Sequence, residues 1–112
     1  MEKIEVKYCF NINRYHSFFI ELLANKEKNQ PGWIDYTKSD FIFYVDAISK
    51  ECHIIHPFEI RDYLAKHDYQ TKECFKDGYK ISVGAIVPLK EFSQEYYIKT
   101  ISLEKYAYLK RS

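Results

Sequence analysis

The sequence predicts an α+β fold with a central mixed β-sheet and one or two short helices packed against it. Short runs rich in apolar and aromatic residues, bounded by turn-forming residues, predict strands over residues 3–9, 17–24, 40–47 and 51–56. Pro57 follows the last run at a point where a helix can begin. The length of 112 residues is typical of one domain, so we expect residues 1–112 to form a single unit around one sheet.

The second half of the chain continues with helix, connection and strand. Apolar residues recur at helical spacing after Pro57 and predict a helix that ends near His67. Residues 68–79 are mostly polar and indicate a connection, whereas residues 80–87 predict a strand. Gly84 inside that strand indicates a bulge or the close approach of another backbone. A short helix from Pro88 to Glu95 and a final strand over residues 97–103 complete the prediction, and we expect the tail beyond it to fray.

Charge and composition narrow the class of protein. The formal net charge is +1, so no global electrostatic attraction to nucleic acid exists and any contact must use a local patch. Aromatic residues make up 18% of the chain, which fits either a ring-rich core or a recognition surface; Tyr96, Tyr97, Tyr106 and Tyr108 are candidates for such a surface. The charged residues at the N-terminus do not fit a signal peptide, and we expect no contact with a membrane. The three cysteines, Cys9, Cys52 and Cys74, lack C-x-x-C spacing, which predicts reduced thiols in a cytoplasmic protein.

The candidate chemistry begins on the first predicted strand. Residues two apart in a strand point the same way, so Glu5 and Lys7 share one face while Ile4 and Val6 share the other. A carboxylate that holds a hard cation beside an ammonium that stabilises an anion suits metal-assisted phosphodiester cleavage. The same pair also occurs on ordinary solvated strands, so the spacing alone does not decide between the two.

A second acid lies within the next apolar run. Glu21 stands among mostly apolar neighbours, and a buried carboxylate without a partner is costly, so it must face water, meet a cation or sit beside a metal. If residues 3–9 and 17–23 form a hairpin, Glu21 lies near Glu5 and Lys7 at one water-facing spot. The next loop carries candidates for contact with a nucleic acid: Lys38 for phosphate, and Trp33 and Tyr36 for stacking on bases or for packing against protein. Interspersed acids favour an ordinary solvated loop as the alternative.

Four ordered segments together resemble the restriction-endonuclease-like PD-(D/E)XK nuclease superfamily, in particular its small phage-type members. They are Ile4-Glu5-Val6-Lys7-Tyr8, Phe19-Ile20-Glu21, Pro31-Gly32-Trp33 and Thr37-Lys38-Ser39-Asp40-Phe41. The later Ile54-Ile55-His56-Pro57 and the helix after it are similar to the closing strand and helix of that family. The resemblance covers roughly residues 3–67 and implies a restriction-endonuclease-like core.

The resemblance also implies site roles. Glu5 and the carbonyl of Val6 would hold Mg²⁺ or Mn²⁺, Lys7 would steady the attacking water or the phosphorane charge, and Glu21 would assist. The family places a metal-binding Asp on a strand upstream of its E-x-K motif, whereas only residues 1–4 precede Glu5 here. We therefore expect an N-terminally truncated core with weak or absent cleavage, because Mg²⁺ requires several well-placed oxygen ligands.

Two function classes follow from this pattern. The first is a metal-dependent, endonuclease-like phosphodiesterase or a DNA-binding derivative of one. The second is a non-enzymatic interaction protein that uses a degenerate nuclease fold to bind and inhibit another macromolecule, for example as a phage-encoded inhibitor of a host defence nuclease. The expected partner is nucleic acid or a complex that processes it. An uncovered sheet edge near the N-terminus also predicts a homodimer or edge pairing with a partner.

Overall fold

The computed structural model describes residues 2–9, 16–76, 80–103, and the predicted tail and its Tyr106 and Tyr108 lie outside them. Its strands are β1 (Ile4–Cys9), β2 (Ser17–Asn25), β3 (Gln30–Pro31), β4 (Phe41–Asp46), β5 (Glu51–Ile55), β6 (Gln70–Lys76), β7 (Lys80–Pro88) and β8 (Lys99–Ser102). Its helices are α2 (Trp33–Tyr36), α3 (Pro57–Lys66) and α4 (Leu89–Glu95). The α+β class, the mixed sheet and the short packed helices are confirmed.

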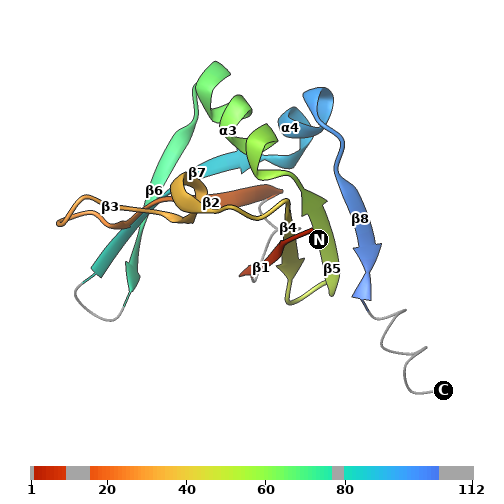
Figure 1. The fold of residues 1–112 in the computed structure, drawn as a ribbon, viewed down its shortest axis with the longest axis horizontal. Helices are drawn as coiled ribbons and strands as arrows, with labels where there is room; N and C mark the ends of the chain where they lie inside the picture. The colour runs from red at the N-terminus through yellow and green to blue at the C-terminus, as the bar shows by residue number, and fades with distance from the viewer. Residues whose placement is uncertain (1, 10–15, 77–79, 104–112) are drawn as a thin grey trace.

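The strands form two four-stranded sheets instead of the one sheet that we predicted. The mixed sheet has the order β1-β4-β5-β8, with β1 parallel to β4 and the other pairs antiparallel. The antiparallel sheet has the order β3-β2-β7-β6. Figure 1 shows the mixed sheet on the right, the antiparallel sheet extending to the left, and α3 and α4 together above their junction.

The predicted hairpin between residues 3–9 and 17–23 is wrong. β1 pairs with β4, and the two strands match residue for residue from Ile4 opposite Phe41 to Cys9 opposite Asp46. β2 instead pairs with the equally long β7. This pairing lets Phe18 and Ile20 point into the core, where each is at most 1% exposed. Burial of these large side chains decides which strands pair, because register follows the side chains that must leave water.

One hydrophobic core joins the two sheets. Its members come from β2, β4, β5, β7 and all three described helices: Phe18, Ile20, Trp33, Ile34, Ile42, Tyr44, Ile55, Ile60, Tyr63, Ala85, Val87 and Phe92. The hydroxyl of Tyr44 on β4 also donates a hydrogen bond to the carbonyl of Phe19 on β2. A buried tyrosine needs such a partner for its hydroxyl, so this bond ties the mixed sheet to the antiparallel sheet.

Local signals explain the turns and helices that the sequence predicted. In the turn from β4 to β5, the Asp46 carboxylate accepts hydrogen bonds from the backbone N–H groups of Ile48 and Ser49, and Lys50 adopts φ 60°. This is an Asx-type turn, which short acidic side chains favour. Pro57 begins α3 as expected. Within the described residues, no helix combines the length and the apolar character needed to cross a membrane.

Polar contacts hold α3 against α4. Asp62 on α3 accepts a hydrogen bond from the Tyr96 hydroxyl, just after α4, and forms an ion pair with Lys66 at 2.9 Å. The Tyr96 hydroxyl first and Lys66 second hold the pKa of the Asp62 carboxyl below its usual value. Because the side chains of Lys66 and Asp62 are 59% and 44% exposed, their ion pair contributes little stability, and the core beneath the helices, against which Tyr96 packs, contributes more.

Residues 70–76, predicted as part of a connection, form the edge strand β6. Its polar sequence hides the strand signal, because an edge strand exposes polar side chains that discourage pairing with other chains. β7, in contrast, was predicted correctly. At Gly84 the close neighbour is a side chain and not the backbone that we expected: a Cβ atom there would lie only 2.2 Å from the Cζ atom of the Phe19 ring. The register of β2 against β7 shifts beside Gly84, between Glu21 and Leu23, which agrees with the alternative of a bulge.

Gly84→Ala is expected to lower the free energy of unfolding by about 1–3 kcal/mol, because the added methyl group overpacks the site under the Phe19 ring. Urea unfolding measures the change. The double variant with Phe19→Leu serves as the control, since a smaller side chain reduces the clash. A Gly84→Ala penalty of the same size in both backgrounds would contradict the proposed contact.

His53 on β5 is expected to make stability depend on pH. It is 5% exposed, and burial lowers its pKa from the ordinary 6.5, while Glu51 and Asp46 act in the opposite direction. Below pH 6.5 the unfolded chain therefore takes up a proton before the folded chain does, and the free energy of unfolding falls as the pH falls. Urea midpoints between pH 7 and pH 5 should fall less steeply in His53→Gln; equal slopes would contradict this reading.

Candidate functional site

The candidate site is a group of four side chains that we call the Glu5–Lys7 cluster: Glu5, Lys7, Trp33 and Thr37. Glu5 and Lys7 share one face of β1, as predicted, and their side chains form an ion pair with 3.0 Å between Lys7 Nζ and Glu5 Oε2. The Thr37 hydroxyl donates a hydrogen bond of 3.3 Å to Glu5 Oε1. The strand alternation that places the acid and the amine together is a local property, whereas the threonine arrives through the fold.

Lys7 lies over an aromatic ring. Its Nζ atom is 5.1 Å from the centroid of the Trp33 ring, within the range of a cation–π contact. Trp33 is 5% exposed and belongs to the core, so its ring is engaged in packing. Of the two roles that the sequence left open for this residue, packing against protein is the one that this geometry favours.

The loop before α2 is seated directly on β2. The backbone N–H of Gly32 donates a 2.8 Å hydrogen bond to the carbonyl of Leu22. A Cβ atom at Gly32 would lie 2.2 Å from the carbonyl oxygen of Glu21, so only glycine fits this close approach to backbone. The loop therefore connects the β2 backbone at Glu21 with Trp33 and, through its ring, with Lys7.

Arg61 on α3 stabilises the same segment from the other side. Its Nε atom donates to the carbonyl of Ile34 at 2.8 Å, and its Nη2 atom donates to the carbonyl of Thr37 at 2.9 Å. These bonds satisfy carbonyls at the end of α2, which a short helix leaves without partners. Sequence reasoning missed Arg61 as a positioning residue, because nothing in the spacing of a helical arginine indicates which loop it reaches.

Asp40 fixes the start of the β1–β4 pairing. Its carboxylate accepts a 2.7 Å hydrogen bond from the backbone N–H of Lys3, and its own N–H donates to the Lys3 carbonyl at 2.7 Å. Short acidic side chains often accept a backbone hydrogen bond in this way next to the start of a strand. It holds β1 in the register that sets Glu5 beside Thr37.

Glu21 is buried, with 8% of its surface exposed, and it is not left without a partner. It lies on β2, opposite Gly84 of β7, and so belongs to the antiparallel sheet. The hairpin that was to bring it to Glu5 does not form. Its backbone instead approaches the cluster through Gly32, and an assisting role for its carboxylate stays a prediction.

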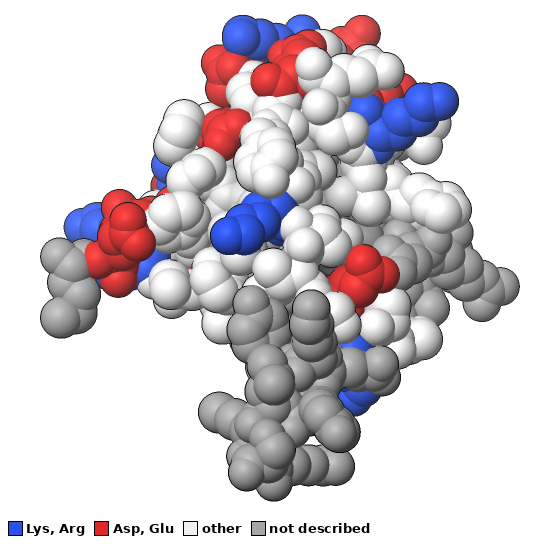
Figure 2. All heavy atoms as spheres, turned by 90° about the vertical axis from the view of Figure 1, so that its right-hand side faces the viewer, with Lys and Arg blue, Asp and Glu red and all other residues white. Residues whose placement is uncertain are grey.

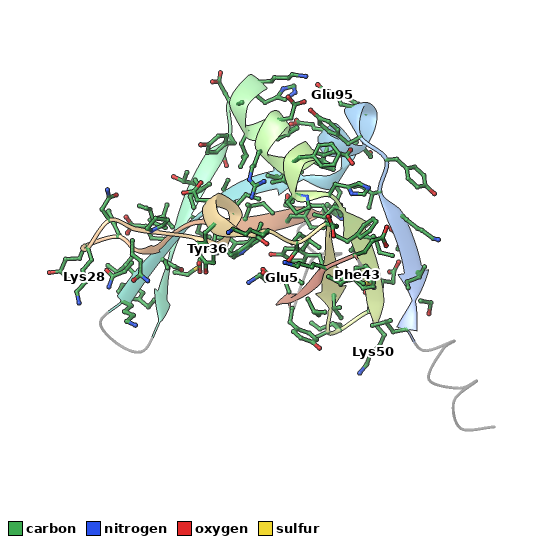
Figure 3. All side chains as sticks on the ribbon, in the orientation of Figure 1. Glu5, Lys28, Tyr36, Phe43, Lys50 and Glu95 are labelled. Atoms are coloured by element: carbon green, nitrogen blue, oxygen red, sulfur yellow. The ribbon has the colours of Figure 1, made fainter. Side chains whose placement is uncertain are left out.

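The other predicted contact residues differ in exposure and place. Tyr36 is 61% exposed at the end of α2, and Lys38 is exposed in the loop after it. Figure 3 shows Tyr36 and Glu5 near the middle of the view and Lys28 at the far tip of the β2–β3 hairpin. Tyr36 and Lys38 thus remain available to a ligand that reaches the cluster, whereas Lys28 points away from it.

The face of β1 that carries the charges is the more covered one. The Lys7 and Glu5 side chains are 30% and 29% exposed, while Ile4, Val6 and Tyr8 on the opposite face are 51%, 45% and 71% exposed. The water-facing spot that we expected for Glu5 and Lys7 is therefore only half open. The loop from Gly32 to Thr37 covers it, because Trp33 and Thr37 contact these two residues.

The cluster fits a divalent cation only in part. Glu5 Oε2 is buried and, beside its ionic contact with Lys7, has no hydrogen-bond donor among the described residues, so it keeps acceptor capacity. However, the described residues contain no group of three or more His, Cys, Asp or Glu side chains that could hold a metal ion. One carboxylate falls short of the several oxygens that Mg²⁺ takes. The carbonyl of Val6 as a further ligand stays a prediction.

Comparisons of the chain with protein-family models, with curated proteins and with solved structures found no match. The geometry of the cluster is therefore the basis on which a function can be argued.

Thr37→Val is expected to lower the free energy of unfolding by about 1–3 kcal/mol. The valine removes the hydroxyl that the buried Thr37 donates to Glu5 and leaves the Oε1 atom of this partly covered carboxylate with one partner fewer. Thr37→Ser, which keeps the hydroxyl, is the matched control and should lose less than half as much in the same urea titration. A larger loss in the serine variant would show that the methyl group, and not the hydrogen bond, is what matters.

Proposed function

We propose that this chain is a nuclease-like protein that binds nucleic-acid phosphate at the Glu5–Lys7 cluster, with a divalent cation such as Mg²⁺ or Mn²⁺ as a weakly held helper. The observation that carries the proposal is convergence. Three of the four segments on which the PD-(D/E)XK resemblance rests contribute side chains to the cluster: Glu5 and Lys7 on β1, Trp33, and Thr37. The β2 segment reaches it only indirectly, because the backbone of Glu21 lies against Gly32.

Convergence supports function because the segments are far apart in sequence and a packing role does not require charges. Thr37 reaches Glu5 across 32 positions of the chain. An ion pair that was only structural would gain little here, since its partners are partly exposed and screened by solvent. A carboxylate and an ammonium held side by side on a rigid strand are, however, suited to bind a phosphate and its counterion together.

The chemistry of each group follows from its charge. Lys7 supplies a cationic donor for a phosphate oxygen, and Glu5 supplies the anionic oxygen that would hold a cation. When bound, such a cation would neutralise phosphate charge and polarise the phosphoryl group. Because the described residues provide one carboxylate at the cluster, we derive no cleavage step and expect cleavage to be slow or absent.

Electrostatics limits how tightly a nucleic acid can bind. The net charge is +1, and Figure 2 shows Lys and Arg interspersed with Asp and Glu over one face. Other lysines are already paired with acids, as Lys26 is with Glu73. Binding should therefore involve few phosphates and show a shallow dependence on salt.

Calorimetric titration with Mg²⁺ or Mn²⁺, followed by binding and cleavage assays on linear, nicked and branched DNA, tests the proposal. Glu5→Gln should abolish metal uptake, because it removes the charge and keeps the shape of the side chain. Lys7→Ala should weaken DNA binding and reduce the slope of log affinity against log salt by about one unit, as expected for one lost phosphate contact.

Lys28→Ala is the matched control for DNA binding, because Lys28 lies at the far hairpin tip. It should leave both the affinity and the salt slope close to those of the wild type. DNA binding that Lys28→Ala weakens and Lys7→Ala does not would place the contact elsewhere. The absence of both metal uptake and DNA binding in a folded chain would rule out the proposed site.

A second candidate function is favoured by the exposed apolar residues of β1. Ile4, Val6 and Tyr8 form a stripe on an edge strand, beside the half-buried Phe41 and Phe43 of β4. A stripe of this kind is typical of surfaces that bind protein. On this reading the chain is a non-enzymatic interaction protein that binds and inhibits another macromolecule, and the DNA assays above would show no binding.

A further inference from the structure

β1 forms one edge of the mixed sheet and is unlike the other edges of the fold. Among the described strands it is hydrogen-bonded to β4 alone. Its outward side chains Ile4, Val6 and Tyr8 are apolar and about half exposed or more. Natural proteins usually protect an edge with charges, prolines or a very short strand.

The remaining edges carry such protection. β3 is two residues long and contains Pro31. β8 begins with the exposed Lys99, and β6 carries the exposed charges Lys72 and Glu73. Pairing of β6 with a second copy of itself about its middle residue would set Glu73 opposite Glu73, which like charges disfavour. β1 is therefore the one edge among the described strands that combines length, exposure and apolar side chains.

The peptide groups of β1 are oriented for further pairing. Both the N–H and the C=O of Lys3 point toward the start of β4, where Asp40 and Phe41 are their partners. In a strand, the N–H and C=O of one residue point to the same edge, and those of the next residue point to the opposite edge. Glu5 and Lys7, two and four positions after Lys3, therefore also direct their N–H and C=O groups toward β4. The N–H and C=O groups of Ile4, Val6 and Tyr8 then face the open edge.

We propose that a second copy of this chain pairs with β1 in antiparallel orientation, about a two-fold axis at Val6. Val6 then lies opposite Val6 of the second copy, and Ile4 lies opposite its Tyr8. These are the residues whose peptide groups face the open edge, so each opposed pair exchanges two hydrogen bonds and the interface gains about six in all.

The charges of β1 are complementary to themselves in this register. Glu5 lies opposite Lys7 of the second copy, and Lys7 lies opposite its Glu5. Both fall at non-hydrogen-bonded positions, where opposed Cα atoms are only about 4.5 Å apart and side chains interact most closely. The apolar stripe on the other face also meets its own copy, which covers side chains that are otherwise exposed.

The pairing joins two mixed sheets into one continuous sheet and brings two Glu5–Lys7 pairs onto the same surface. The two Glu5 residues occupy diagonal positions about 7–8 Å apart, so the second copy supplies the further carboxylate that the cluster of a single chain lacks. The interface is small, and we therefore expect a reversible dimer that forms at high protein concentration. The pairing itself does not rest on the proposed function.

Sedimentation equilibrium of single charge variants and of their mixture tests the register. Glu5→Lys alone opposes two cations, and Lys7→Glu alone opposes two anions, so each should lower the association constant at least tenfold. Mixing the two variants makes every opposed pair complementary again, and association should return to within about threefold of the wild type.

The same charge changes on β6 provide the control. Glu73→Lys and Lys72→Glu, measured separately and mixed, should associate as the wild type does, because β6 is outside the interface. Val6→Lys, which places two cations on the axis, should abolish association, whereas Ile48→Lys in the β4–β5 turn should not. Thermal unfolding of each variant confirms that the chain is folded. If Glu5→Lys or Lys7→Glu does not fold, Val6→Lys still tests the proposal.

A wild-type chain that stays monomeric up to millimolar concentration would overturn the proposal. So would association that Glu5→Lys, Lys7→Glu and Val6→Lys leave unchanged, since another surface would then be responsible. Either result leaves the proposed function intact if Mg²⁺ uptake and DNA binding still require Glu5 and Lys7. Conversely, a dimer with the predicted charge pattern and no DNA binding would retain the interface and remove the proposed function.

Discussion

The segment from Gly32 to Thr37 is the constraint on which the rest of the structure depends. It is bonded to β2 through Gly32, contacts β1 through Trp33 and Thr37, and is held by Arg61 of α3. The segment supplies Trp33 and Thr37, which are half of the cluster, and it also supplies Trp33 and Ile34 to the core that the two sheets share. Because Gly32 lies against the backbone of Glu21, the segment has little freedom to shift, and this fixes where Trp33 and Thr37 meet Lys7 and Glu5.

The distribution of polarity on β1 is the reverse of what a surface strand usually shows. Its charged side chains point toward the segment that covers them, and its apolar side chains are the exposed ones. An exposed apolar stripe costs stability through its contact with water unless a ligand or partner covers it. A charged pair on the covered face costs desolvation, which the hydroxyl of Thr37 and the ring of Trp33 offset in part. Both features are typical of a strand whose sequence serves recognition as well as folding.

Much of the fold could be predicted because its signals are local. Pro57 and the spacing of apolar residues after it predict α3. The gap between the predicted strands 40–47 and 51–56 marks the turn between β4 and β5, although the hydrogen bonds that the Asp46 carboxylate accepts in it were not predicted. β6 was missed because a strand at a sheet edge carries exposed polar residues and resembles a loop in sequence. The division into two sheets was missed because the apolar runs of β1 and β2 predict that strands form but do not predict which strands they pair with.

The sequence by itself determined that Glu5 and Lys7 share a face, because side-chain direction along a strand alternates whatever the strand pairs with. It also determined the position of β7, whereas the neighbour of Gly84, the Phe19 ring, was set by the pairing of β2 with β7. Only the tertiary structure decided that Thr37, Trp33 and Arg61 surround that pair, and that Glu21 lies in the other sheet. The reason is physical: alternation is a property of one strand, whereas the choice of pairing partner is made by the burial of large side chains such as Phe18, which depends on the whole chain at once.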